Sequence, residues 1–154
     1  MSLFNNTVKV IRLRENSKIP HRAHATDAGM DFFYCPSSGQ DIVIAPGQSA
    51  LLMTGVKVEV PEDCMLQVMN KSSIASKRSL ITGACVVDCG YDGEIFVNLH
   101  NVGKEEQTIL PGHKIAQGVF VKIGRPVLAE VQTESVYDSS TSRGSGALGS
   151  TGET

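Results

Sequence analysis

The stretch that decides the fold is Gly83-Ala84-Cys85-Val86-Val87-Asp88-Cys89-Gly90-Tyr91-Asp92-Gly93-Glu94-Ile95. Apolar runs flank it on both sides, and its centre is rich in glycine and acidic residues, which is typical of a β-hairpin. Asp92-Gly93 is a strong turn signal, because glycine adopts positive φ without steric cost. The sequence therefore predicts two strands joined by a tight, polar tip.

Asp88 is the first charged residue after the apolar run that enters this tip, and Tyr91 follows three residues later. A carboxylate at the end of an apolar strand is expected to be partly desolvated, which raises its pKa and makes it a better general base. Aspartate also caps turns through its own backbone, and the hairpin alone favours this structural role. Both interpretations stay open at this point.

The rest of the chain reads as a series of short strands separated by Pro- and Gly-bearing turns. No window sustains an apolar stripe of helical period, and the best helical segment is the brief Ser72–Lys77. This spacing of strands predicts an all-β sandwich or barrel. The expected strands are Val8–Leu13, Met30–Tyr34, Ile42–Ile44, Ser49–Met53, Val56–Val60, Met65–Met69, Ala84–Val87, Ile95–Leu99, Ile115–Ile123 and Val127–Val131.

Length and charge narrow the class of protein. A chain of 154 residues predicts one domain with a real core, and a formal net charge of −2 gives no electrostatic footprint for duplex nucleic acid or an anionic membrane. No secretory signal and no apolar run of membrane-spanning length are visible. The four cysteines lack metal-binding spacing, which predicts free thiols and a cytoplasmic protein; they are Cys35, Cys64, Cys85 and Cys89.

Two polar segments suit an anion such as phosphate. Asn70–Ser79 combines cations with hydroxyls at a predicted helix start, where backbone N–H groups point outward. Thr133–Thr154 is a polar tail, and its part Arg143–Gly152 could wrap a polyphosphate with backbone amides and a guanidinium. An ordinary solvated loop and a disordered terminus are the alternatives. We expect a β domain over residues 1–132 and a tail over residues 133–154.

Together with the hairpin, these segments form an ordered set of five motifs that covers nearly the whole chain. The chain resembles the trimeric dUTPases (deoxyuridine triphosphate nucleotidohydrolases). The resemblance implies a jelly-roll, β-barrel-like (β-clip) fold with a flexible Gly-rich tail. It also implies a homotrimer in which three subunits share each active site. The motifs are Ala28–Phe32, Asn70–Ala75, Gly83–Ile95, Gly112–Gln117 and Arg143–Gly152.

The resemblance further implies hydrolysis of dUTP to dUMP and pyrophosphate. Asp88 would be the general base for a water that attacks the α-phosphorus, and Asp31 would hold Mg²⁺ through its waters. Tyr91 would lie against the deoxyribose and exclude a 2′-hydroxyl, while backbone groups of Gly83–Gly90 would read the uracil edge. The implied substrate-binding residues are Lys71, Ser72, Ser73, Gly83, Val87, Tyr91, Gln117, Arg143, Gly146, Leu148, Ser150 and Thr151.

Three of these positions depart from the family pattern. Lys71 stands where arginine is usual and loses the bidentate fork, and Ser73 stands where glycine is commoner. Leu148 replaces an aromatic residue that would stack on the uracil, and it has no π face. The departures predict a weaker closed state than in a typical member.

Two alternatives follow from the same resemblance. A related dCTP deaminase would carry a catalytic glutamate at the position of Asn98, and an amide cannot shuttle the protons of deamination. A non-catalytic nucleotide-sensing or interaction protein could also use this scaffold. The acidic residues, Tyr91, Gln117 and Arg143 of the motifs argue against lost catalysis.

Overall fold

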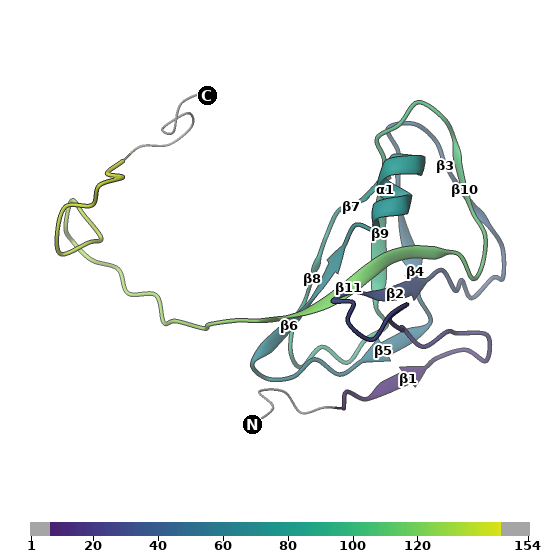
Figure 1. Cartoon of the computed structure of the whole chain (residues 1–154), viewed down its shortest axis with the longest axis horizontal. Helices are drawn as coiled ribbons and strands as arrows, with labels where there is room; N and C mark the ends of the chain where they lie inside the picture. Colours follow the sequence, from purple (N-terminus) through teal and green to yellow (C-terminus); the bar gives the residue numbers. More distant parts are fainter. Residues whose placement is uncertain (1–6, 146–154) are drawn as a thin grey trace. The chain divides into compact units, whose positions relative to one another are not determined.

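The computed structural model describes residues 7–145, and over these residues its regular secondary structure is strands with one short helix (Figure 1). The strands are β1 (Val10–Arg12), β2 (Met30–Phe33), β3 (Ile42–Ile44), β4 (Ser49–Met53), β5 (Val56–Val58), β6 (Cys64–Met69), β7 (Leu80–Thr82), β8 (Val86–Val87), β9 (Phe96–Asn101), β10 (Gln107–Ile109) and β11 (Lys114–Lys122). One short helix, α1 (Ser72–Arg78), lies between β6 and β7. The predicted all-β class is confirmed.

The strands pair antiparallel in four small sheets. The largest has the order β2-β11-β6-β8, the next is β4-β9-β7, and β1 with β5 and β3 with β10 form two further pairs. The long strand β11 lies at the centre of the largest sheet, and a Cβ at its Gly118 would collide with the Phe32 ring and crowd Leu66. Glycine is therefore needed there for space.

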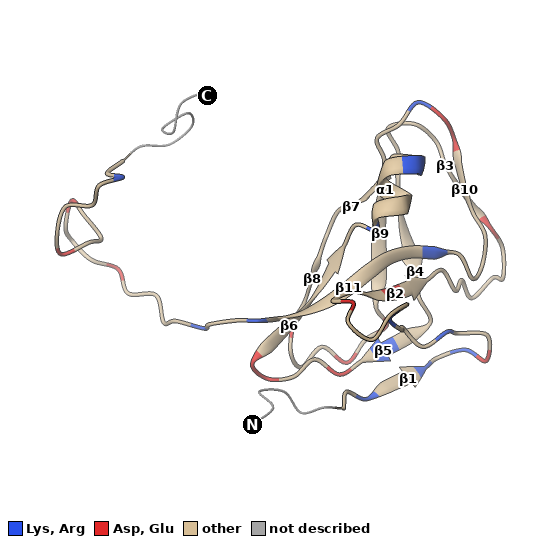
Figure 2. Cartoon of the chain, in the orientation of Figure 1, with Lys and Arg blue, Asp and Glu red and all other residues tan. Residues whose placement is uncertain are grey.

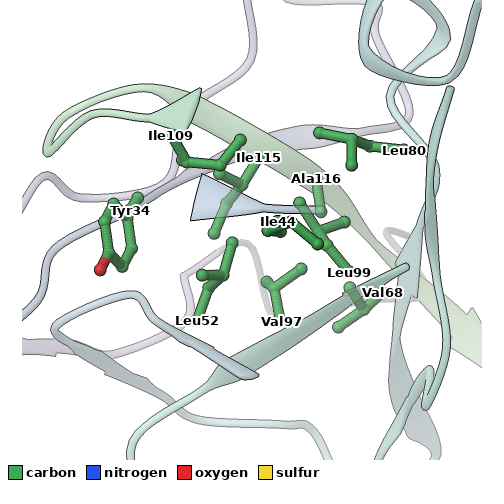
Figure 3. Packing of buried hydrophobic residues seen from close by; sticks show 10 residues of the cluster. All are labelled: Tyr34, Ile44, Leu52, Val68, Leu80, Val97, Leu99, Ile109, Ile115 and Ala116. Atoms are coloured by element: carbon green, nitrogen blue, oxygen red, sulfur yellow. The ribbon is translucent and has the colours of Figure 1, made fainter. Parts of the chain in front are cut away.

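Two clusters of buried apolar side chains form the core. In the first, shown in Figure 3, β9 contributes Val97 and Leu99 while the alternate residues of the strand face away. This period of two is what a half-buried strand requires. The other members drawn are Tyr34, Ile44, Leu52, Val68, Leu80, Ile109, Ile115 and Ala116. The second cluster contains Phe32, Val56, Val58, Val60, Cys64, Leu66 and Ile95.

Most predicted elements are present, and β3 and β4 have the predicted bounds. The helix ends one residue later than predicted. Two three-residue strands, β7 and β10, were not predicted. The strand expected over Val127–Val131 is wrong: Val127 is 95% exposed and Leu128 is 93% exposed, so neither is held in a sheet by the chain.

The chain divides into two units, Met1–Gly124 and Arg125–Thr154. The first holds all the strands and the helix of the described residues. In the second, residues 126–145 are exposed, and hydrogen bonds join residues close in sequence, such as Gly144 N–H to the Thr141 carbonyl at 3.2 Å. The predicted division at residues 132 and 133 stays a prediction. Between residues 7 and 145, no helix has the length and apolar character that crossing a membrane requires.

Candidate active site

Asp31 on β2 is a buried carboxylate held by two lysines. Its side chain is 7% exposed, its Oδ1 lies 2.8 Å from Lys71 Nζ, and its Oδ2 lies 2.7 Å from Lys114 Nζ. The contact with Lys71 is a hydrogen bond. The contact with Lys114 is a close ion pair whose angle is poor for a hydrogen bond, so Oδ2 is left without a well-aligned donor.

These lysines keep Asp31 ionised. Burial by itself raises the pKa of a carboxyl group, but the pairing with Lys114 and Lys71 outweighs it, and the net pKa of Asp31 is lowered. Figure 2 shows basic residues on α1 and near the start of β11, interspersed with acidic residues over the strands and loops of the first unit. The positive charge at Asp31 is therefore local.

Gln117 on β11 links this carboxylate to the start of α1. Its Cα lies opposite Asp31 on one side and opposite Met69 on the other, and its Nε2 donates to the Asn70 carbonyl at 2.9 Å. The structure thus brings together the first, second and fourth motifs. We refer to Asp31, Lys71, Lys114 and Gln117 as the lysine–aspartate cluster.

The first turn of α1 adjoins this cluster. Lys71 is the N-cap residue, with an extended backbone and no side-chain cap hydrogen bond, and the first turn carries no acidic residue. Ser72 and Ser73 are the first two residues of the helix and are exposed. Two exposed serines therefore follow Lys71 at the start of the helix, and serine hydroxyls can donate hydrogen bonds to phosphate oxygens.

The hairpin presents Asp88 in a different environment. Strand β8 is only two residues long and lies at the edge of its sheet, so Asp88 just beyond it is exposed. The prediction that the Asp88 carboxylate is partly desolvated is therefore wrong for a single chain. The turn is closed by the Tyr91 N–H and the Asp88 backbone carbonyl at 3.3 Å, and among residues 7–145 no hydrogen bond to the Asp88 carboxylate is found. The backbone of Asp88 thus closes the turn, as the structural interpretation of this residue expects.

A pocket of about 230 Å³ opens beside this carboxylate. Asp88, Tyr91 and Glu94 line it from the hairpin, and Asn98 lines it from β9. The Tyr91 hydroxyl donates to the Glu94 carbonyl at 2.9 Å, which fixes the ring at the pocket wall. Binding clefts for small molecules typically measure about 300–1,000 Å³, so this pocket is small for a whole nucleotide. We call it the hairpin pocket.

Glu94 belongs to a partly buried ion pair that links the hairpin to the Gly55 backbone and to Arg14. Arg14 donates to both of its oxygens, at 2.8 and 2.9 Å, and the Gly55 N–H donates to Oε1 at 2.7 Å. The two side chains are only 20% and 12% exposed. Burial raises the pKa of Glu94, but the Arg14 and Gly55 contacts outweigh it and lower the net pKa. Lys57 Nζ adds a contact of 2.8 Å to the Asp92 carbonyl.

The lysine–aspartate cluster and the hairpin pocket lie apart in one chain. Asp31 is on β2 and Val87 is on β8, at opposite edges of the same four-stranded sheet. Neighbouring strands are spaced by about 4.8 Å, so three steps separate these edges by about 14 Å. None of the residues that define the cluster lines the pocket. Asp31 and the hairpin carboxylate thus lie at opposite edges of this sheet, although Lys71 follows β6, the strand next to β8.

Comparison with known proteins agrees with this arrangement of motifs. The family model for dUTPase matches residues 15–152. The chain belongs to the dUTPase family. It is 38% identical to a deoxyuridine 5′-triphosphate nucleotidohydrolase of Clostridium tetani (96% of this chain, 97% of the relative). It is 37% identical to that of Mus musculus (96% and 86%) and 40% identical to that of Alkaliphilus metalliredigens (97% and 99%).

Solved structures show the same fold. A dUTPase of Staphylococcus bacteriophage 80alpha, bound to the dUTP analogue dUpNHpp, superposes with a TM-score of 0.81 at 29% identity, over 96% of this chain and 99% of that one. A dUTPase of phage phi11 of S. aureus, solved with a structural Mg(II) ion, superposes with a TM-score of 0.76 at 28% identity, over 87% of this chain and 100% of that one. The predicted family, jelly-roll-like fold and enzyme class are therefore confirmed.

The family's fifth motif lies in the second unit of the chain. Arg143 is exposed there. Gly146, Leu148, Ser150 and Thr151 lie outside the described residues. The roles predicted for these five residues stay predictions, as do those of Gly83, Val87 and the other substrate-binding residues.

The residues present fit a magnesium ion that is held mainly by phosphate. Within residues 7–145, no three side chains of the His, Cys, Asp or Glu types gather in one place, so an all-protein cage is not formed there. Asp31 offers a single carboxylate that its lysines keep ionised. Mg²⁺ keeps most of its waters and commonly binds through one or two carboxylates and substrate phosphates, which suits this dUTPase-family site.

Sequence reasoning missed several residues of the site. Lys114 lies inside the fourth motif, but β11 has a register shift between Lys114 and Ala116. Simple alternation along the strand therefore does not predict on which face the Lys114 side chain lies. Arg14 and Glu94 are 80 residues apart in sequence, so no local pattern joins them. Asn98 and His100 alternate with core residues of β9, which marks them as facing outward but not as lining a pocket.

Proposed function

We propose that Asp88 is the general base with which this enzyme hydrolyses dUTP to dUMP and pyrophosphate. The supporting observation is a contrast inside the hairpin pocket. Two carboxylates line that pocket, and both oxygens of Glu94 are engaged by Arg14. The Asp88 carboxylate is exposed and has no hydrogen-bond partner among the described residues. It is the one free to accept a proton from water.

The remaining contacts would position the substrate. Tyr91, fixed by its hydroxyl, would lie against the deoxyribose, and backbone groups from Gly83 to Val87 would read the base. Lys71, Ser72, Ser73 and Gln117 would hold the phosphates. Mg²⁺, held through water by Asp31, would neutralise the triphosphate when bound. Such positioning and charge neutralisation are the main contributions of a protein to phosphoryl chemistry.

We propose further that the complete site forms in a homotrimer. The separation of about 14 Å between Asp31 and the Asp88 hairpin supports a site in which the two carboxylates come from different copies. The small pocket and the exposed Val127 and Leu128 support contact with another copy. The tail residues Arg143, Gly146, Leu148, Ser150 and Thr151 would then close the site formed by the other two chains.

A cytoplasmic location is part of the same proposal. All four cysteines are free, and two of them, Cys35 and Cys64, are buried. Free thiols persist in a reducing compartment, whereas secreted proteins of this size commonly use disulfides.

The test is the pair of variants Asp88→Asn and Asp92→Asn. A positioned base contributes about 10²–10⁴ in rate, so Asp88→Asn should lose that factor in kcat while keeping affinity for dUTP. Asp92 is a matched control, because it is exposed on the same hairpin and contacts only Lys57 through its carboxylate. Pyrophosphate release should be followed with dUTP, dCTP, dTTP and UTP. Unchanged turnover in Asp88→Asn would disprove the assignment.

A further inference from the structure

Two polar side chains of β9, Asn98 and His100, form a hydrogen-bonded pair at the hairpin pocket. Asn98 lines the pocket, and His100 Nε2 lies 2.7 Å from Asn98 Oδ1. Both residues are half-buried and lie on the face of β9 opposite to Val97 and Leu99. The catalytic proposal above makes no use of either side chain.

The surrounding hydrogen bonds fix the orientation of the Asn98 amide. Its Nδ2 lies 3.4 Å from the carbonyl oxygen of Ala50, which can only accept a hydrogen bond. The reverse orientation would place two acceptors against each other, so the amide nitrogen faces Ala50 and Oδ1 faces His100. Because Oδ1 only accepts, His100 must donate from a protonated Nε2. The amide has two N–H groups, and Ala50 uses one.

Gly83 shows how closely the hairpin approaches this pair. A Cβ at position 83 would collide with Asn98 Oδ1 and with His100 Nε2. The Gly83 N–H also donates to the Asn98 backbone carbonyl at 2.9 Å. The pair therefore stands directly against the start of the segment whose backbone is proposed to read the base.

We propose that Asn98 is a base-specificity residue that donates its second N–H to O4 of uracil. This inference rests on the function proposed above and deepens it. Uracil presents an acceptor, O4, at the position where cytosine carries an amino group that donates. A fixed N–H donor therefore attracts uracil and leaves the cytosine amino group facing another donor. A site built around such a hydrogen bond rejects the analogue that cannot make it.

His100 has a separate role as a positioning residue. His100 does not line the pocket, and it is joined to Asn98 by the hydrogen bond between its Nε2 and Asn98 Oδ1. That bond prevents the amide from turning its oxygen toward the base. Without it, the amide could rotate and present an acceptor, which would suit cytosine as well as uracil.

The test measures binding of dUDP and dCDP to the full chain by titration calorimetry. Asn98→Asp replaces the free donor with an acceptor of the same shape. It should lower the affinity for dUDP by about 10- to 100-fold, because a lost or mismatched buried hydrogen bond costs that much. It should raise the affinity for dCDP. Asn98→Leu, which removes the donor without adding an acceptor, should lower the affinity for dUDP and raise the affinity for dCDP less than Asn98→Asp does. An equal change for both nucleotides in either variant would overturn the proposal.

Variants of His100 separate positioning from packing. His100→Gln keeps an N–H donor near the position of Nε2 and should keep the ratio of dUDP to dCDP affinity close to that of the parent chain. His100→Leu removes the donor and should reduce the ratio about tenfold. If both variants changed the ratio equally, His100 would have no role in orienting Asn98.

These outcomes are distinguishable from failure of the proposed reaction. Binding of the diphosphates requires neither turnover nor Asp88. If the parent chain hydrolyses dUTP and Asn98→Asp leaves the affinity ratio unchanged, only the specificity role is lost. If the parent chain binds dUDP selectively but leaves dUTP intact, the reaction is lost and the specificity role stands.

Discussion

Asp31 and Asp88 are the two carboxylates that the proposed reaction needs, and the fold places them in opposite environments. Asp31 is buried and held between two ammonium groups, whereas Asp88 is exposed at the end of a two-residue edge strand. A carboxylate whose oxygens are both engaged is suited to holding charge in place. A carboxylate without a protein partner is suited to exchanging a proton with water. The difference separates a structural anchor from a base.

The largest difference should appear in stability. Asp31→Asn leaves two lysines facing each other without a counter-charge, and breaking a buried pair costs about 3–5 kcal/mol. Asp88→Asn, at an exposed position, should change the free energy of unfolding by about 0.5 kcal/mol or less. Denaturant unfolding at one fixed protein concentration measures both values. Equal losses of unfolding free energy in the two variants would show that Asp31 is no more a structural anchor than Asp88.

The ion pair behind the hairpin offers the next test. Arg14→Met leaves the partly buried Glu94 carboxylate without its guanidinium and should cost about 1–3 kcal/mol, less than the loss of a fully buried pair. The matched control is Lys9→Met, because the Lys9–Glu59 pair has side chains that are 84% and 47% exposed. That pair is screened by water, so its loss should leave the unfolding midpoint nearly unchanged. If the control were as damaging as Arg14→Met, anchoring by this pair would be the wrong explanation.

A smaller effect should follow acidification. The pKa values of Asp31 and Glu94 are lowered in the folded chain, so each group adds stability above its unfolded pKa of about 4. That stability is lost as the pH falls through the folded pKa values. The unfolding midpoint should therefore decline below about pH 4, and less steeply in Arg14→Met. Identical pH profiles for the parent chain and the variant would show that Glu94 contributes nothing to acid stability.

Local patterns predicted most strands, because short apolar runs or alternating residues are bounded by Pro- and Gly-bearing turns. β3 and β4 match their predicted bounds, and α1 begins at the predicted residue. The strand expected over Val127–Val131 had the right residues but pairs with no strand among residues 7–145. Alternation shows which face of a strand is apolar. It does not show whether another strand lies beside it.

The motifs predicted which residues belong to the candidate site. They did not predict the contacts between those residues. The motifs named Asp31, Lys71 and Asp88, whereas the Lys114 contact depends on a register shift in β11. The exposure of Asp88 also departs from its sequence context, since an apolar run predicts burial only where the strand is covered. Contacts between residues far apart in sequence need the sheet order, which no single segment encodes.

The central claim is that the anchor and the base of one active site come from different copies of the chain. The most direct measurement mixes two inactive variants, Asp31→Asn and Asp88→Asn, after partial unfolding and reassembly. Random mixing should restore about one quarter of the parent dUTP turnover. Half of the chains carry an intact Asp31 and half carry an intact Asp88, so about one quarter of the shared sites contain both carboxylates. If every site drew both carboxylates from one chain, each would keep a defect and the mixture would stay inactive.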